Sequence, residues 1–136
     1  MKRTICPFVI ATVFSTIAYP VSAELAIVVN PRNQATSMTA AQASQFFLGG
    51  SVLFTPLEQA SDTPIRAEFY KKVLEKEPSQ VQAVWARIVF TGKGRPPKEY
   101  KSSADIKKAI SENVNAIGYI EKSAVDDSVK VIATIP

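Results

Sequence analysis

Histidine is absent from the 136-residue sequence, and cysteine occurs once, at Cys6. Imidazole and thiolate are the main protein ligands of zinc and of most transition metals, so metal sites of that kind are excluded. Nucleophilic catalysis by Ser-His or Cys-His pairs is excluded for the same reason. A single cysteine cannot form a disulfide within the chain. We therefore expect no metal site, no cofactor and no covalent cross-link, and the fold must depend on its core.

Long apolar segments are also scarce, and the one candidate lies at the N-terminus. Residues 5–18 are mostly apolar and follow two basic residues, and the small residues at 21–23 are typical of a signal-peptidase cleavage site. The apolar segment is shorter than the about 20 residues that a membrane span requires. We therefore predict a secretory signal peptide at 1–23 and a protein that is secreted to the periplasm and inserts into no membrane.

The remaining 113 residues, 24–136, suit one domain, which would bury roughly two-thirds of its unfolded surface. Loss of the two basic residues of the leader lowers the net charge from +4 to +2, and fourteen basic residues stay interspersed with twelve acidic ones. This balance lacks the basic footprint of nucleic-acid-binding proteins. We therefore expect a single domain that binds no nucleic acid.

The order of strand-like and helix-like segments predicts an α/β fold. Residues 25–29 form a continuous apolar run rich in β-branched residues, which is typical of a central strand covered on both faces. Thr39 is a suitable N-cap for the helix that follows, and Gly49-Gly50 would end it. Gly118 marks a close backbone approach or a bulge within a later strand. The expected helices are 40–48, 64–74, 80–90 and 104–113, the last capped by Ser103, and the further strands are 54–58, 116–120 and 129–135.

The sequence predicts the buried face of the third helix, and it leaves two interpretations of the segment that follows. Apolar residues at helical spacing predict an inner face on the helix at 80–90, with Trp85 in the core. The segment at 91–101 is basic and rich in glycine and proline, so it is either a solvated loop or a patch that meets an acidic partner or an anion. The predicted inner face comprises Val81, Val84, Trp85, Ile88 and Val89.

The turn at 61–66 is the main candidate site. Thr63 precedes Pro64, which suits an N-cap followed by the first helical residue. Free backbone N–H groups, the hydroxyls of Ser61 and Thr63, and the guanidinium of Arg66 would together favour an anion. The alternative is an ordinary capped helix that packs on the sheet.

Six segments of the chain resemble the phosphate-binding proteins of phosphate ABC transporters, in the type 2 periplasmic binding protein superfamily. The resemblance is strongest to the short, single-domain members, and it extends over nearly all of 24–136. The matching segments are VVNP (28–31), AAQASQFFLGG (40–50), SDTPIRAEFY (61–70), VWARIVFTGKGRPP (84–97), NAIGYIEKSAV (115–125) and VKVI (129–132).

This resemblance implies a single periplasmic-binding-protein-like lobe, with a central mixed sheet flanked by about four helices. In full-length relatives a Ser-Gly-Thr turn at a helix N-terminus holds phosphate, with an arginine nearby. Ser61-Asp62-Thr63 falls on that turn, so the implied ligand-binding residues are Ser61, Asp62, Thr63 and Arg66. Asp62 replaces the glycine, and it either accepts a hydrogen bond from a protonated phosphate oxygen or caps the helix.

Two functions follow from these features. The first is a non-catalytic module that binds phosphate or another small oxyanion. The alternative is a single-lobe scaffold that binds an envelope protein or forms a homodimer and binds no solute. An enzyme is disfavoured, because Asp62 and Glu68 do not share a helical face and no histidine can act as a base.

Overall fold

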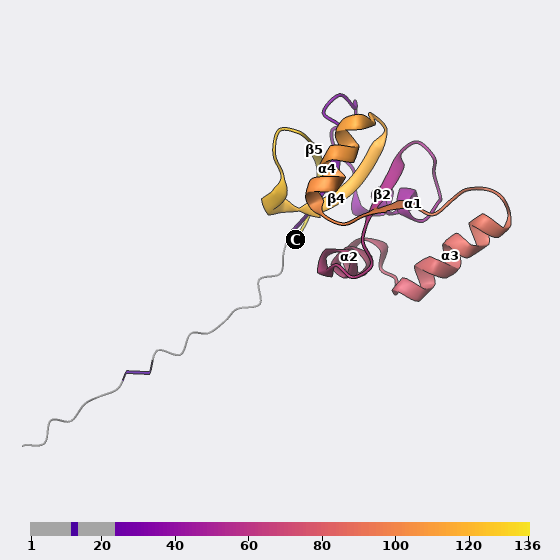
Figure 1. The fold of residues 1–136 in the computed structure, drawn as a ribbon, viewed down its shortest axis with the longest axis horizontal. Coiled ribbons are helices and arrows are strands. Elements are labelled where there is room, and N and C mark those ends of the chain that lie inside the picture. The colour runs from indigo at the N-terminus through magenta and orange to yellow at the C-terminus, as the bar shows by residue number, and fades with distance from the viewer. Residues whose placement is uncertain (1–11, 14–23) are drawn as a thin grey trace, which may run out of the picture.

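The computed structural model describes residues 12–13 and 24–136, so the predicted signal peptide, apart from residues 12 and 13, lies outside the described residues. Five strands form one mixed sheet in the order β3-β2-β4-β1-β5, with helices on both faces (Figure 1). The predicted α/β fold, with a central mixed sheet and four flanking helices, is confirmed. Within 24–136, no helix combines the length and the apolar character that a bilayer crossing requires. The elements are β1 (Leu25–Val29), α1 (Ala40–Phe47), β2 (Thr55–Gln59), α2 (Pro64–Phe69), a π-helical turn (Tyr70–Leu74), α3 (Pro78–Phe90), β3 (Lys98–Tyr100), α4 (Ser103–Glu112), β4 (Ala116–Glu121), a 3₁₀ turn (Lys122–Ala124) and β5 (Lys130–Ile135).

Strand β1 lies inside the sheet and contributes side chains to the two hydrophobic cores, one on each face of the sheet. It pairs antiparallel with β4 on one side and with β5 on the other, and all five of its residues are fully buried. Leu25, Ile27 and Val29 face the core formed with α1, α2 and the π-helical turn, whereas Ala26 and Val28 face the core formed with α4. The predicted central strand covered on both faces is confirmed.

Aromatic residues fill the core between the sheet and α1 and α2. The rings of Phe69 and Tyr119 stack with centroids 3.8 Å apart and 4° between their planes. Phe47 meets the Phe69 ring edge-on at 4.8 Å. These three residues come from α2, β4 and α1, so their contacts fix both helices on the sheet.

Gly118 lies where α4 packs closely on β4, as the sequence predicts. A Cβ atom at this position would lie 2.9 Å from Cγ2 of Ile106 and 3.3 Å from Cδ1 of Ile110. We expect Gly118→Ala to lower the free energy of unfolding by about 1–3 kcal/mol, because the helix must shift to admit a methyl group. Gly50→Ala is the control, since its Cβ would meet nothing closer than 3.5 Å. Urea unfolding of both variants checks this, and equal losses would contradict it.

The structure corrects the predicted inner face of α3. Only Val81 of this helix is buried, and Val89 is 49 % exposed. Trp85 is half-buried at the margin of the core, where its Nε1 donates a hydrogen bond to the carbonyl of Phe47 at 3.0 Å. Figure 1 shows the reason, because α3 stands away from the sheet.

Two smaller predictions near α4 are also wrong. Ser102, rather than Ser103, is the N-cap, and its hydroxyl accepts a hydrogen bond from the backbone of Asp105 at 3.2 Å. The predicted loop at 91–101 contains β3, which pairs in parallel with the second half of β2. A three-residue edge strand has no apolar run of its own, so only its partner strand specifies it.

Candidate functional site

The carboxyl ends of β2 and β3 lie side by side, and each leads into a helix. β2 is parallel to β3, with Gln59 opposite Tyr100. Thr63 precedes α2 and Ser102 precedes α4, so the starts of two helices meet at one edge of the sheet. In open α/β sheets, ligands bind in the crevice outside the carboxyl ends of the strands. A hollow of about 490 Å³ lies here, and its polar lining comprises Gln59, Thr63, Glu68, Lys101, Ser102, Ser103 and Glu121.

Side chains from β2, α4 and β4 form a short hydrogen-bonded chain in this hollow. Nε2 of Gln59 donates to the hydroxyl of Ser103 at 3.2 Å, and that hydroxyl donates to Oε2 of Glu121 at 2.6 Å. Lys101 lies beside them and has no ion pair within 24–136. The sequence did not identify Lys101 and Ser103 as site residues, because strand pairing alone brings them near Thr63. The basic character of the 91–101 segment was the one available signal.

The structure keeps three of the four predicted site residues on one turn. Ser61 and Asp62 are exposed, and Thr63 is the N-cap of α2, as predicted. The Thr63 hydroxyl donates to the carbonyl of Ala60 at 2.7 Å and makes no capping hydrogen bond to the helix. The Asp62 side chain is exposed, and among the described residues no hydrogen bond joins its carboxylate to α2.

Arg66, the fourth predicted residue, points away from the hollow that Thr63 lines. Its Nη1 donates to the carbonyl of Gln59 at 3.0 Å and to Oε1 of Glu99 at 2.6 Å. Its Nε donates to the hydroxyl of Tyr70 at 3.0 Å. The guanidinium is thus held by β2, β3 and the start of the π-helical turn, and it faces the groove between α3 and β3.

A buried carboxylate lies next to Arg66. Glu58 is 3 % exposed, and its carboxylate accepts hydrogen bonds from the hydroxyls of Tyr119 and Tyr70, the latter at 3.2 Å. Burial raises the pKa of Glu58 to about 7, against the opposing effects of the tyrosine hydroxyls and the charge of Arg66. Burial and the charge of Glu58 also raise the pKa of Tyr70 to about 12. Both forms of Glu58 are therefore populated near neutral pH.

No protein-family model matches the sequence, and no curated protein matches it. Solved structures do match the fold. A protein from Clostridium perfringens with bound phosphate, described as a phosphate ABC transporter substrate-binding protein, superposes with a TM-score of 0.66 at 20 % identity. An ABC-type phosphate transport receptor from Vibrio cholerae gives 0.64 at 21 %, and PstS from Borrelia burgdorferi gives 0.62 at 14 %. The chain shares the fold of part of these phosphate-transport receptors.

The likeness extends over most of this chain but under half of each receptor. The superpositions cover 81 % of this chain and 45 % of the Clostridium protein, and 82 % of this chain and 47 % of the Borrelia protein. The predicted resemblance is therefore confirmed for the fold, and the chain spans less than half of the length of each receptor. Identities of 14–21 % show the shared fold alone.

Proposed function

We propose that this receptor-like lobe binds phosphate or another small oxyanion at the turn that joins β2 to α2, and that it catalyses no reaction. The observation that supports this most is the meeting of two helix starts at the carboxyl ends of β2 and β3. Unpaired N–H groups and helix dipoles at such ends favour negative charge. We also propose that the domain is secreted to the periplasm after removal of residues 1–23.

Each residue of the turn has a distinct part in this proposal. The hydroxyl of Ser61 and the first free amides of α2 donate hydrogen bonds to the anion. The hydroxyl of Thr63 does so after it rotates away from the carbonyl of Ala60, to which it donates in the structure. Asp62 accepts one from a protonated oxygen, which favours phosphate over sulfate because sulfate carries no proton at neutral pH. Arg66 supplies positive charge from one turn into α2, and it contacts the anion only after releasing Glu99, the Gln59 carbonyl and the Tyr70 hydroxyl.

A single lobe leaves such a site open on one side. Charge-assisted hydrogen bonds exposed to water are screened by solvent and salt. We therefore expect a dissociation constant on the order of 0.1–1 mM for the isolated chain. A second copy or a protein partner would tighten binding by excluding water from the open side.

Calorimetric titration with phosphate tests the proposal. We expect saturable binding that Thr63→Ala weakens about tenfold, because the variant lacks a donor to a charged oxygen. Glu99→Gln should strengthen binding, since it removes the negative charge that compensates the Arg66 guanidinium. Thr36→Ala, which changes an exposed threonine elsewhere in the chain, is the control and should have no effect. The absence of saturable binding at both low and physiological salt would refute the proposal.

The second candidate is a scaffold that binds an envelope protein or a second copy of the chain, without a solute. Four large exposed apolar residues in two segments of the chain favour it, because exposed apolar surface commonly marks an interface. These four residues are Val52 at 91 %, Leu53 at 76 %, Val89 at 49 % and Phe90 at 92 % exposure.

Titration with phosphate separates the two candidates, since phosphate should raise the stability of an anion-binding lobe and leave that of a scaffold unchanged.

A further inference from the structure

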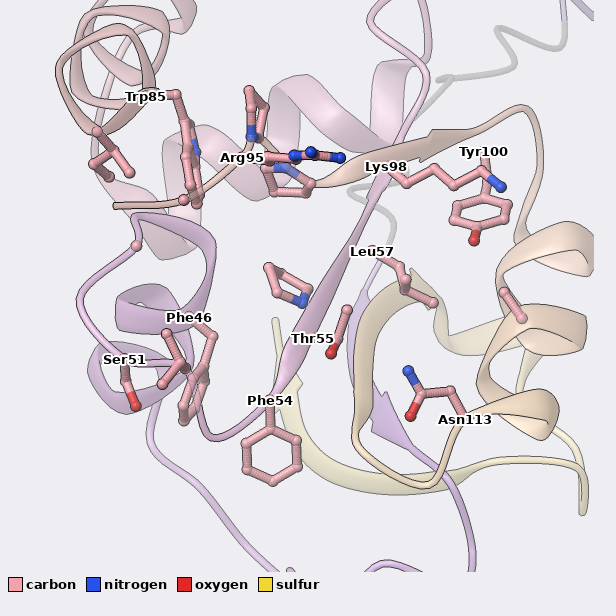
Figure 2. Close-up of a pocket in the computed structure, with 18 of the residues that line it drawn as sticks. Phe46, Ser51, Phe54, Thr55, Leu57, Trp85, Arg95, Lys98, Tyr100 and Asn113 are labelled. Carbon is pink, nitrogen blue, oxygen red and sulfur yellow. The ribbon is translucent and has the colours of Figure 1, made fainter. Parts of the chain in front are cut away.

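A second cavity lies at the beginning of β2, at the opposite end of the strand from the proposed anion turn (Figure 2). Its volume is about 670 Å³, and we call it the basic-rimmed pocket. Figure 2 shows Trp85, Arg95 and Lys98 along one side of it, and Phe46 and Phe54 along the other. The apolar part of its lining includes Phe46, Phe54, Leu57, Trp85, Ile88 and Tyr100.

The pocket exists because β3 pairs with only the later part of β2. β3 pairs with β2 from Leu57 onward, so Thr55 and Pro56 have no strand beside them on that side. Pro56 has no N–H group, so an uncovered edge leaves no donor unpaired there. The segment between α3 and β3 spans the gap instead, and Gly94 lets it pass close to the helix, because a Cβ would lie 3.2 Å from Cγ2 of Ile88.

The charged groups of the pocket are predominantly basic. Lys93, Arg95 and Lys98 line it, and Glu112 is the one acidic residue among the described residues that do so. None of the three bases is in an ion pair with another described residue, and the Lys98 ammonium lies 5.5 Å from the centre of the Tyr100 ring. Uncompensated positive charge beside an apolar wall complements a ligand that is anionic at one end and apolar at the other.

We propose that the basic-rimmed pocket binds a small amphiphilic anion, with a carboxylate, sulfonate or phosphate-ester head on an apolar ring or chain. The head would lie against Arg95 and Lys98, and the apolar part against Trp85 and Phe54. The cavity volume is typical of sites for ligands of this size. Inorganic phosphate has no apolar part, so this site differs in ligand class and in position from the anion turn.

The fluorescent anion 8-anilinonaphthalene-1-sulfonate is a suitable probe. Trp85 is the one tryptophan of the sequence and lines the pocket, so its emission should transfer energy to the bound probe. We expect saturable binding that Arg95→Gln and Lys98→Gln each weaken about five- to tenfold. Lys71→Gln, at an exposed lysine outside the pocket, should not weaken it. The uncharged analogue N-phenyl-1-naphthylamine should bind more weakly and respond to none of these variants.

Competition distinguishes this site from the other surfaces. Decanoate should displace the probe, and decanol at equal concentration should not. The proposal is overturned if Arg95→Gln binds the probe as tightly as the wild type while Phe90→Ser loses it, because the exposed end of α3 would then be the site. It is also overturned if millimolar inorganic phosphate displaces the probe and Thr63→Ala abolishes that displacement, because the two sites would then be one.

Discussion

Glu58→Gln is expected to raise the stability of the protein at about pH 8 and to remove most of the dependence of its stability on pH between 4.5 and 7. In the folded state burial raises the pKa of this carboxyl from 4.5 to about 7, so the folded protein holds a proton that the unfolded chain releases at lower pH. The stabilisation is complete below pH 4.5 and is lost as the pH rises through about 7. That shift corresponds to about 3 kcal/mol. The amide of the variant would stay neutral, with its oxygen accepting a hydrogen bond from the Tyr119 hydroxyl and its NH2 group donating to the oxygen of Tyr70, because the two tyrosines bond to different oxygens of Glu58.

Urea unfolding at half-unit steps of pH measures this effect. The wild type should lose stability steadily between about pH 5 and 7 and then level off, whereas the variant should stay nearly level. Glu112→Gln is the control, because this residue is exposed at the end of α4, and it should keep the wild-type slope. An unchanged slope in Glu58→Gln would show that Glu58 is ionised in the folded protein throughout this range.

Phe69→Ala should destabilise the protein by about 3–5 kcal/mol, the largest loss that we expect from a single substitution. The side chain is fully buried and lies between the rings of Tyr119 and Phe47. Domains of this size are stable by only about 5–15 kcal/mol, so the variant should be close to unfolding. The loss should also loosen Tyr119, which donates a hydrogen bond to Glu58.

Phe90→Ala is the matched control, because the same substitution is made on a ring that is 92 % exposed. We expect a change within about 0.5 kcal/mol. Thermal and urea unfolding of the two variants at several protein concentrations would compare them. A large, concentration-dependent loss in Phe90→Ala would mean that the end of α3 is covered by a second copy in solution, and it would favour the scaffold over the isolated lobe.

Local chemistry predicted the central parts of the fold well. The apolar run of β1 is stable only where both faces of the strand are buried, and all of its residues are buried in the structure. Thr39 caps α1 through a capping box with Gln42, and Thr63 with Pro64 begins α2. In each case the information lies within four or five consecutive residues, which is the range over which dihedral preferences and capping act.

The surroundings of the candidate site could not be predicted in the same way. Arg66 pairs with Glu99, which is 33 positions later and lies on a strand that has no apolar pattern. From the sequence alone Glu58 resembles an exposed strand residue, because no local pattern shows that the hydroxyls of Tyr70 and Tyr119 bond to its carboxylate. Helical spacing likewise identified the apolar stripe that contains Trp85. It could not show that α3 packs so little against the rest of the domain that only Val81 of this helix is buried. Each of these features depends on contacts between distant segments.

The place of β1 in the sheet has a consequence for the order of events during synthesis. Leu25 pairs with Glu121 on one side and with Ile135 on the other, so the strand made first finds its partners last. Pairings over such long separations form slowly, because the intervening chain must be closed into a loop first. The nascent polypeptide therefore cannot complete its sheet until nearly the whole chain has been translated. For the secretion that we propose, this late completion has a use, because a chain that is still unfolded is the form that a narrow translocation channel admits.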